Sequence, residues 1–186
     1  MSRPAFAFVP VLLMMLSSPA AAQRREPRHD GFWVGFGVGA GSNLTEGYDD
    51  ARLGGSGYVR LGGTVNPMLL IGGEAMGWAR EQNGTTVSQG NLTASVLLYP
   101  VRRGLYLKGG LGFASWSAQT SPSANTTVTT TAGGFGATVG GGYDIQIGNN
   151  LFVTPNLDFL LQVVDRNAFP ATTGYLILFT LGLTWH

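Results

Sequence analysis

The chain has no cysteine and very little charge. Its 186 residues include 11 Lys and Arg, 10 Asp and Glu and two histidines, which gives a net charge of +1 and a charged fraction of 11%. This balance offers no basic tract for nucleic acid. The lack of thiols excludes disulfides and the lipid-accepting cysteine of a bacterial lipoprotein. Two histidines without a cysteine provide no transition-metal site, so we expect neither a metal nor another cofactor.

Long hydrophobic runs are missing as well. Beyond the N-terminus no stretch approaches the roughly 18 apolar residues that a transmembrane helix needs. The N-terminus itself has a basic start at Arg3, a short apolar core and the small residues Ala20, Ala21 and Ala22. This is the layout of a secretory signal peptide. We therefore expect residues 1–22 to be a cleaved signal peptide. In the mature protein, residues 23–30 would form a periplasmic N-terminal arm and residues 31–186 the barrel domain.

Glycine and alternating apolar residues dominate the rest of the chain, with 29 glycines and 44% hydrophobic residues. In GFWVGFGVGAG, residues 31–41, bulky apolar residues take every second position, and glycine occupies most of the others. Period-2 alternation indicates β-strands. It recurs in eight segments, each long enough to cross a bilayer as a tilted strand. The predicted strands are residues 31–41, 55–65, 69–80, 90–99, 105–117, 132–147, 151–164 and 174–186.

The connections between these segments alternate in length. Those after the second, fourth and sixth are short, at residues 66–68, 100–104 and 148–150. The others are expected to be longer polar loops, at residues 42–54, 80–89, 118–131 and 165–173. Short turns on the periplasmic side and long loops outside are typical of bacterial membrane barrels. The sequence therefore predicts an all-β fold, an eight-stranded antiparallel up-and-down transmembrane β-barrel.

Alternation alone does not say which face of the barrel points outward. Glycines crowd the more polar face, which suits the narrow interior of an eight-stranded barrel. No segment provides the amphipathic helix that a soluble, lipocalin-like barrel packs against its wall. We expect the apolar face to meet lipid and glycine to make room inside. A soluble periplasmic barrel that carries an apolar ligand remains an alternative.

The predicted inward face includes charged residues that need partners, because an unpaired buried charge costs several kcal/mol. We expect them to form a cluster of salt bridges. We interpret this cluster as a polar plug that fixes the register, since side chains nearly fill a barrel of this size. A gate in a small, low-conductance pore is the alternative. The predicted lumen charge cluster consists of Arg60, Glu74, Lys108, Asp144 and Asp158.

Four segments carry a family resemblance: the opening GFWVGFGVGAG, LYLKGGLGF at 105–113, GGGYDIQI at 140–147 and the closing GYLILFTLGLTWH. With them the chain resembles the small eight-stranded bacterial outer-membrane barrels of the OmpA, OmpX and opacity-protein type. The resemblance implies Sec-type export, residence in the outer membrane among lipid and lipopolysaccharide, and insertion by the barrel-assembly machinery. The last strand resembles the C-terminal insertion signal, although His186 follows the terminal aromatic residue. That signal would consist of Tyr175, Phe179, Leu183 and Trp185.

The expected function is a structural or surface-interaction role in which extracellular loops bind an unknown ligand, without nucleic acid. A lipid-modifying hydrolase or acyltransferase is the competing class, and it would need a general base near the outer leaflet. The two histidines, His29 and His186, both map to the periplasmic end of the predicted barrel. We therefore expect no enzyme and no catalytic residues.

Overall fold

The computed structural model describes residues 31–44, 52–101, 104–123, 126–166 and 169–186. The predicted signal peptide, the arm at 23–30 and His29 lie outside these ranges. Over the described part of the chain, no helix is long and apolar enough to cross a membrane. The strands are β1 (Phe32–Asn43), β2 (Arg52–Asn66), β3 (Leu69–Gln82), β4 (Thr85–Leu98), β5 (Leu105–Ser123), β6 (Thr126–Tyr143), β7 (Ile145–Gln146), β8 (Leu151–Arg166) and β9 (Phe169–Trp185).

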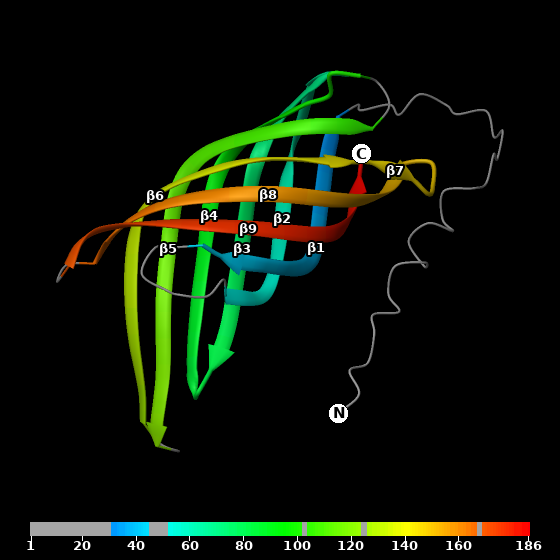
Figure 1. Cartoon of the computed structure of the whole chain (residues 1–186). Helices are drawn as coiled ribbons and strands as arrows, with labels where there is room; N and C mark the ends of the chain where they lie inside the picture. Colours follow the sequence, from blue (N-terminus) through cyan, green and yellow to red (C-terminus); the bar gives the residue numbers. More distant parts are fainter. Residues whose placement is uncertain (1–30, 45–51, 102–103, 124–125, 167–168) are drawn as a thin grey trace, which may run out of the picture.

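The strands form a closed antiparallel barrel (Figure 1). Each strand from β1 to β5 pairs with the one that follows it, and β8 pairs with both β7 and β9. The pairings of β1 with β9 and of β6 with β8 close the sheet on itself. Because β7 continues the course of β6, the wall has eight strands, which confirms the predicted fold class.

A proline explains why β6 and β7 are separate segments. The β6–β8 ladder ends at Gly142 and Asn156, and the β7–β8 ladder resumes at Ile145 and Val153 in the same register. The interruption therefore lies opposite Pro155, which has no N–H to donate to a neighbouring strand. Asp144, the residue between the two segments, donates its backbone N–H to Gly104 of the adjoining turn at 2.9 Å.

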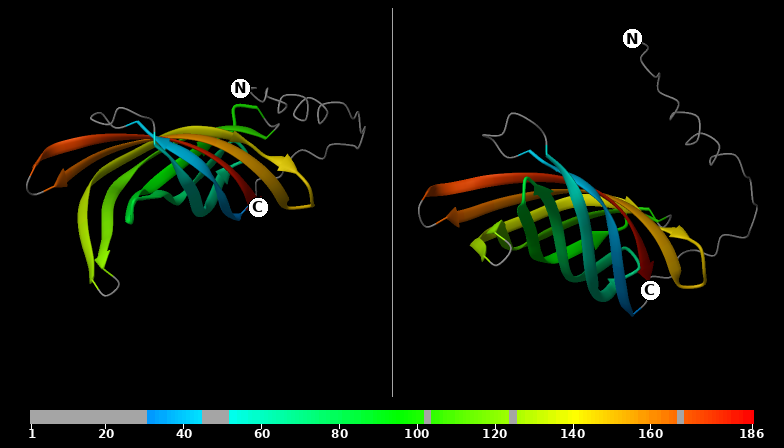
Figure 2. Two further views of the ribbon diagram at one scale, coloured as in Figure 1. Left: turned by 60° about the horizontal axis from the view of Figure 1, so that its bottom comes forward. Right: turned by 90° about the horizontal axis from the view of Figure 1, so that it is seen from below.

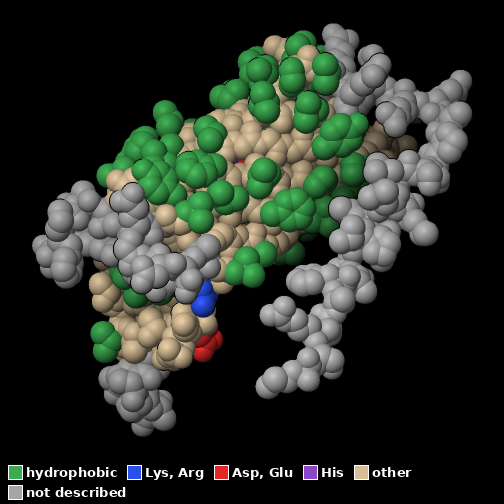
Figure 3. All heavy atoms as spheres, viewed as in Figure 1, with side chains coloured by type: hydrophobic (Ala, Val, Ile, Leu, Met, Phe, Trp, Pro, Cys, Tyr) green, Lys and Arg blue, Asp and Glu red, His purple; other side chains and the backbone are tan. Residues whose placement is uncertain are grey.

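The apolar face of the sheet points outward, as predicted. Figure 3 shows hydrophobic side chains over the visible outer face of the barrel. Phe36 is 55% exposed and Phe113 is 74% exposed, whereas their neighbours Gly35 and Ala114 are buried. This arrangement contradicts the alternative of a soluble barrel, whose outer face would be polar.

The glycines of the inner face make room for large side chains from nearby strands. A Cβ atom on Gly182 would lie 2.1 Å from the hydroxyl of Tyr58, and one on Gly140 would lie 2.0 Å from a carboxylate oxygen of Asp158. Both distances are far below van der Waals contact. Glycine therefore makes room for the packed interior, as the sequence indicated.

The expected long loops are largely strand, and this prediction was wrong in three places. β3 and β4 meet in a two-residue turn, in which Asn83 and Gly84 have φ of 53° and 73°. An Asn-Gly pair with both φ values positive forms the type I′ turn that suits a hairpin. β5 continues to Ser123 before β6 starts at Thr126, and β8 continues to Arg166 before β9 starts at Phe169. Threonine and valine favour strands, so these polar segments extend the hairpins.

The extended hairpins project beyond the closed part of the barrel. Figure 2 shows that the hairpin of β5 and β6 and the hairpin of β8 and β9 leave the barrel in different directions. We call this end of the barrel the loop end. The other end, with the turns after β2, β4 and β7, is the turn end.

Candidate functional site

The lumen is packed with side chains in layers. An apolar layer near the turn end consists of Trp33, Leu70, Leu97, Tyr99 and Tyr106. A second apolar layer, toward the loop end, consists of Tyr58, Met76, Trp78, Leu160, Leu176 and Leu178. Buried polar and charged side chains lie between and beside these layers, so the interior resembles a protein core and not an open channel.

Lys108 joins two carboxylates from other strands. Its ammonium Nζ lies 2.5 Å from Oε1 of Glu74 on β3 and 3.0 Å from Oδ1 of Asp158 on β8. All three side chains are at most 1% exposed. Strands that are not neighbours are thus linked across the lumen by one buried cation.

Arg60 lies beside this group, but its own hydrogen bonds go to neutral side chains. Its Nη1 donates to the hydroxyl of Tyr106 at 2.7 Å, and its Nη2 donates to Oγ1 of Thr184 at 3.1 Å. The guanidinium carbon also lies 4.9 Å from the ring centroid of Tyr58 and 5.1 Å from that of Tyr106, within range of cation–π attraction. Asn156 extends the network, because it accepts from Tyr106 and donates to Tyr58.

Asp144 has its own partners at the turn end and is linked to Arg60 through the hydroxyls of Thr154 and Thr184. Tyr99 donates to its Oδ2 at 2.7 Å, and Thr154 donates to its Oδ1 at 2.8 Å. His186 places Nε2 3.8 Å from the same Oδ2, and its ring meets Phe152 edge-on at 5.2 Å between centroids. The last residue of the chain therefore turns into the lumen.

The five residues of the predicted charge cluster are all buried in the lumen, but they do not form one cluster. Glu74, Lys108 and Asp158 meet directly. Arg60 adjoins them, and Asp144 connects to Arg60 through the neutral hydroxyls of Thr154 and Thr184. Neither the role of Tyr99 nor the lumen position of His186 was predicted from the sequence. The alternation of faces contained the signal, because His186 follows the outward Trp185 and must therefore point inward.

The residues of the predicted insertion signal share the outer face of β9. Phe179 is 59% exposed, Leu183 36% and Trp185 49%. Tyr175 packs beside Phe159 of β8, with ring centroids 5.9 Å apart. These positions form an apolar outer stripe that ends with an aromatic residue at the turn end.

The loop end presents a second candidate site, an uncharged sheet with a free edge. β5 and β6 pair as far as Ser123 and Thr126, whereas the pairing of β6 with β8 ends at Gly133 and Asp165. Residues 127–132 of β6, which we call the open edge, thus have a strand neighbour only on the β5 side among the described residues. Their side chains from Thr127 to Thr131 are exposed.

The sheet behind the open edge is also polar and uncharged. Thr85 of β4 and Thr120 of β5 form a hydrogen bond at 3.1 Å between their hydroxyls, and Gln119 lies opposite Thr129 of the edge. No charged residue occurs between positions 109 and 143 of the sequence. The described residues contain no group of three or more His, Cys, Asp or Glu side chains that could hold a metal ion.

Comparisons with known proteins agree with this architecture. The family model described as outer membrane protein beta-barrel domain matches residues 8–182. The attachment invasion locus protein Ail of Yersinia pestis, whose structure was solved with the heparin analogue sucrose octasulfate, has a similar fold. It is 14% identical, with a TM-score of 0.60, over 84% of this chain and 99% of that one. The neisserial surface protein NspA is 13% identical, with a TM-score of 0.60, over 84% and 97% of the two chains. No curated protein sequence matches the chain.

Proposed function

Because the chain belongs to the family of outer membrane protein beta-barrel domains, we propose that it is a non-enzymatic surface-interaction protein that binds an extracellular partner through its projecting strands. The open edge of β6 carries this proposal. An exposed strand edge presents unpaired backbone N–H and C=O groups, which are a template for another extended chain. Proteins often protect such edges with Lys or Pro. The open edge, with the sequence TVTTTA, has neither.

The composition of the edge points to an extended polypeptide as the partner. In strand addition, main-chain hydrogen bonds supply affinity and side-chain contacts supply specificity. Threonine and valine have high β-propensity and favour such pairing. Ail was solved with a sulfated ligand, but residues 109–143 of this chain, which include the projecting part of the β5–β6 hairpin, have no cation to attract sulfate. At the tips of β3 and β8, Arg80 is followed by Glu81, and Arg166 is preceded by Asp165, so charge there is mixed.

The packed lumen supports a structural role for the charged residues. We infer that Lys108 and its carboxylates hold the strands in register, because apolar layers lie on both sides of them. The small-pore alternative has no comparable support. His186, which a hydrolase would need near the outer leaflet, lies at the turn end.

The proposal includes the route to the membrane. Residues 1–22 would direct Sec-type export and be removed, and the barrel-assembly machinery would read the outer stripe of β9. Lipid and lipopolysaccharide would then surround the barrel wall. The residues read by the machinery would be Tyr175, Phe179, Leu183 and Trp185.

A lysine at the open edge tests the proposed function. The probe is a fluorescent synthetic peptide with the sequence of residues 126–132, offered to bacteria that display the protein. We expect Thr129→Lys to weaken saturable binding by about tenfold, because an edge lysine opposes strand addition. Gln119→Lys is the matched control, because this residue lies opposite Thr129 but one strand in from the edge.

The control variant should bind within about twofold of the wild type, since its strand already has neighbours on both sides. Gel mobility before and after boiling would show that each variant forms a folded barrel. Equal losses in the two variants, or no binding by the wild type, would contradict binding at this edge.

A further inference from the structure

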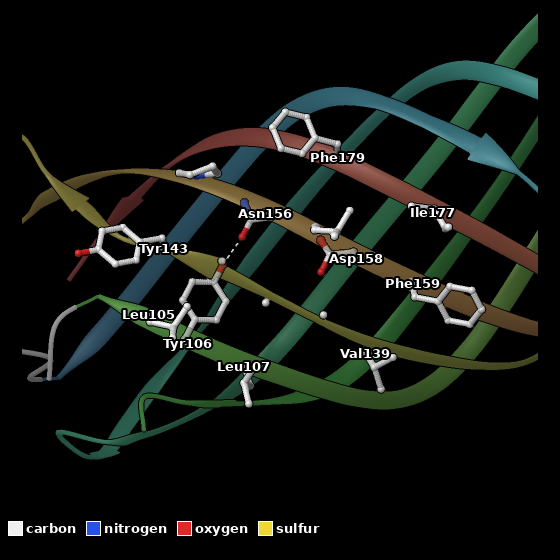
Figure 4. Close-up of a pocket in the computed structure, with 15 residues that line it drawn as sticks. Leu105, Tyr106, Leu107, Val139, Tyr143, Asn156, Asp158, Phe159, Ile177 and Phe179 are labelled. Carbon is white, nitrogen blue, oxygen red and sulfur yellow. Dashed lines mark hydrogen bonds between the residues drawn. The ribbon is translucent and has the colours of Figure 1, made fainter. Parts of the chain in front are cut away.

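The outer wall of the barrel carries an apolar groove over the glycines at 140–142. Figure 4 shows its lining, with Tyr106 and Asn156 joined by a hydrogen bond on the lumen side. The groove has a volume of about 590 Å³, within the range of small-molecule sites. Its rim consists of outward side chains from four strands: Leu105 and Leu107, Val139 and Tyr143, Leu157 and Phe159, and Ile177 and Phe179.

Gly141 forms the floor of this groove. It pairs with Leu107 on one side and Leu157 on the other, so it takes an outward position between Val139 and Tyr143. Leu107, Val139 and Leu157 are 55%, 58% and 58% exposed. These side chains therefore stand around a position that has no side chain of its own.

The local packing keeps this floor bare. A Cβ atom on Gly141 would lie 2.8 Å from the backbone oxygen of Tyr106, which cannot move without disturbing the β5–β6 ladder. Gly140 and Gly142 point inward, where a Cβ would meet Asp158 and the hydroxyl of Tyr106 respectively. Over these residues the wall consists of backbone alone.

The groove is continuous with the surface that meets the membrane. Membership of the outer-membrane barrel family places the apolar outer face against lipid. Lipid acyl chains are as apolar as leucine. An acyl chain would therefore bind in the groove because it packs closely there, and not because it leaves water. An acyl chain that lay across the groove without entering it would leave a void, and the atoms that line the groove would lose van der Waals contacts.

The position of the groove along the barrel indicates which leaflet of the membrane supplies its lipid. Leu105 is the first residue of β5 and Tyr143 is the last residue of β6. The part of the rim that they form therefore lies next to the turn end. Short turns face the periplasm in barrels of this kind, and tyrosine hydroxyls lie at the level of lipid head groups. We propose that the groove over Gly141 binds one acyl chain of a phospholipid of the periplasmic leaflet.

A tryptophan substituted for a rim residue would fill the groove and test this site, while Gly141 keeps its conformation. The purified full-length protein, extracted from outer membranes in mild detergent, would be examined by native mass spectrometry for retained phospholipid. Leu157→Trp places an indole beside Gly141. Leu92→Trp is the matched control, because Leu92 also faces outward and is 60% exposed, but does not line the groove.

We expect the wild type and Leu92→Trp to retain one phospholipid per chain. Leu157→Trp should retain at least about fivefold less, because the packing site is filled. Val139→Trp, on the same rim, should behave like Leu157→Trp, so one poorly folding variant does not decide the result. Equal retention by all four proteins, no retention by the wild type, or retained lipopolysaccharide in place of phospholipid would overturn the site. The edge-lysine experiment does not depend on any of these outcomes.

Discussion

Lys108 is the residue on which the electrostatic balance of the lumen depends. It is the shared partner of Glu74 and Asp158, and all three are buried. Breaking a buried ion pair on one side leaves an uncompensated charge and costs about 3–5 kcal/mol. Arg60 is less coupled to these carboxylates, because neutral hydroxyl and amide oxygens accept its hydrogen bonds.

Lys108→Met should therefore lower the free energy of unfolding by about 3–5 kcal/mol, because it leaves two carboxylates without their cation. Urea-induced unfolding in lipid vesicles, followed by tryptophan fluorescence, measures the loss. The triple variant Lys108→Met, Glu74→Gln, Asp158→Asn removes all three charges and should recover most of it. Equal stabilities of the single and triple variants would show that the charges are not coupled.

At the scale of elements, the hairpins are longer than their polar composition suggests. The β3–β4 hairpin depends on the left-handed conformation of Asn83 and Gly84, which the twist of the strands requires. Serine and threonine continue both strands of the β5–β6 hairpin past the closed barrel. The open edge exists because β6 extends seven residues, from 126 to 132, beyond its last pair with β8.

Gly84→Val should destabilise the protein by about 1–2 kcal/mol, because a side chain with a branched Cβ opposes the left-handed conformation. Gly55→Val is the control, since Gly55 lies in β2 with no atom within 4 Å of its would-be Cβ. The control should lose no stability, because valine favours a strand more than glycine does. The same urea experiment compares the two, and an equal effect would show that the turn conformation is not limiting.

For the whole molecule, two apolar layers and the polar groups between them leave the lumen filled. An eight-stranded barrel has an interior just wide enough for its own side chains. The molecule therefore presents its two candidate binding surfaces on the outside. One is the open edge at the loop end, and the other is the groove over Gly141 on the barrel wall.

Wild-type protein in planar lipid bilayers should show no discrete current steps, because the apolar layers close the lumen on both sides of the charges. Arg60→Ala should be equally silent, since removing one side chain from a polar layer leaves both apolar layers in place. Current steps that change in size in Arg60→Ala or Glu74→Ala would support the small-pore alternative instead.

The sequence by itself determined the barrel, its strand number and the direction of its faces. Alternation with period 2 is a local property, and a one-residue slip would turn every side chain to the wrong face. Once the glycines marked the inner face, Arg60, Glu74, Lys108, Asp144 and Asp158 could therefore be assigned to the lumen from their positions in the alternation. His186 could have been assigned in the same way.

Only the tertiary structure decided which of these residues meet. Contacts across the lumen depend on the tilt and stagger of all strands together, and no single segment encodes them. Lys108 thus reaches Glu74 and Asp158, whereas Asp144 meets Tyr99 and His186. The open edge and the groove are likewise relations between strands. The open edge depends on where the pairing of β8 with β6 ends, and the groove depends on which side chains surround Gly141.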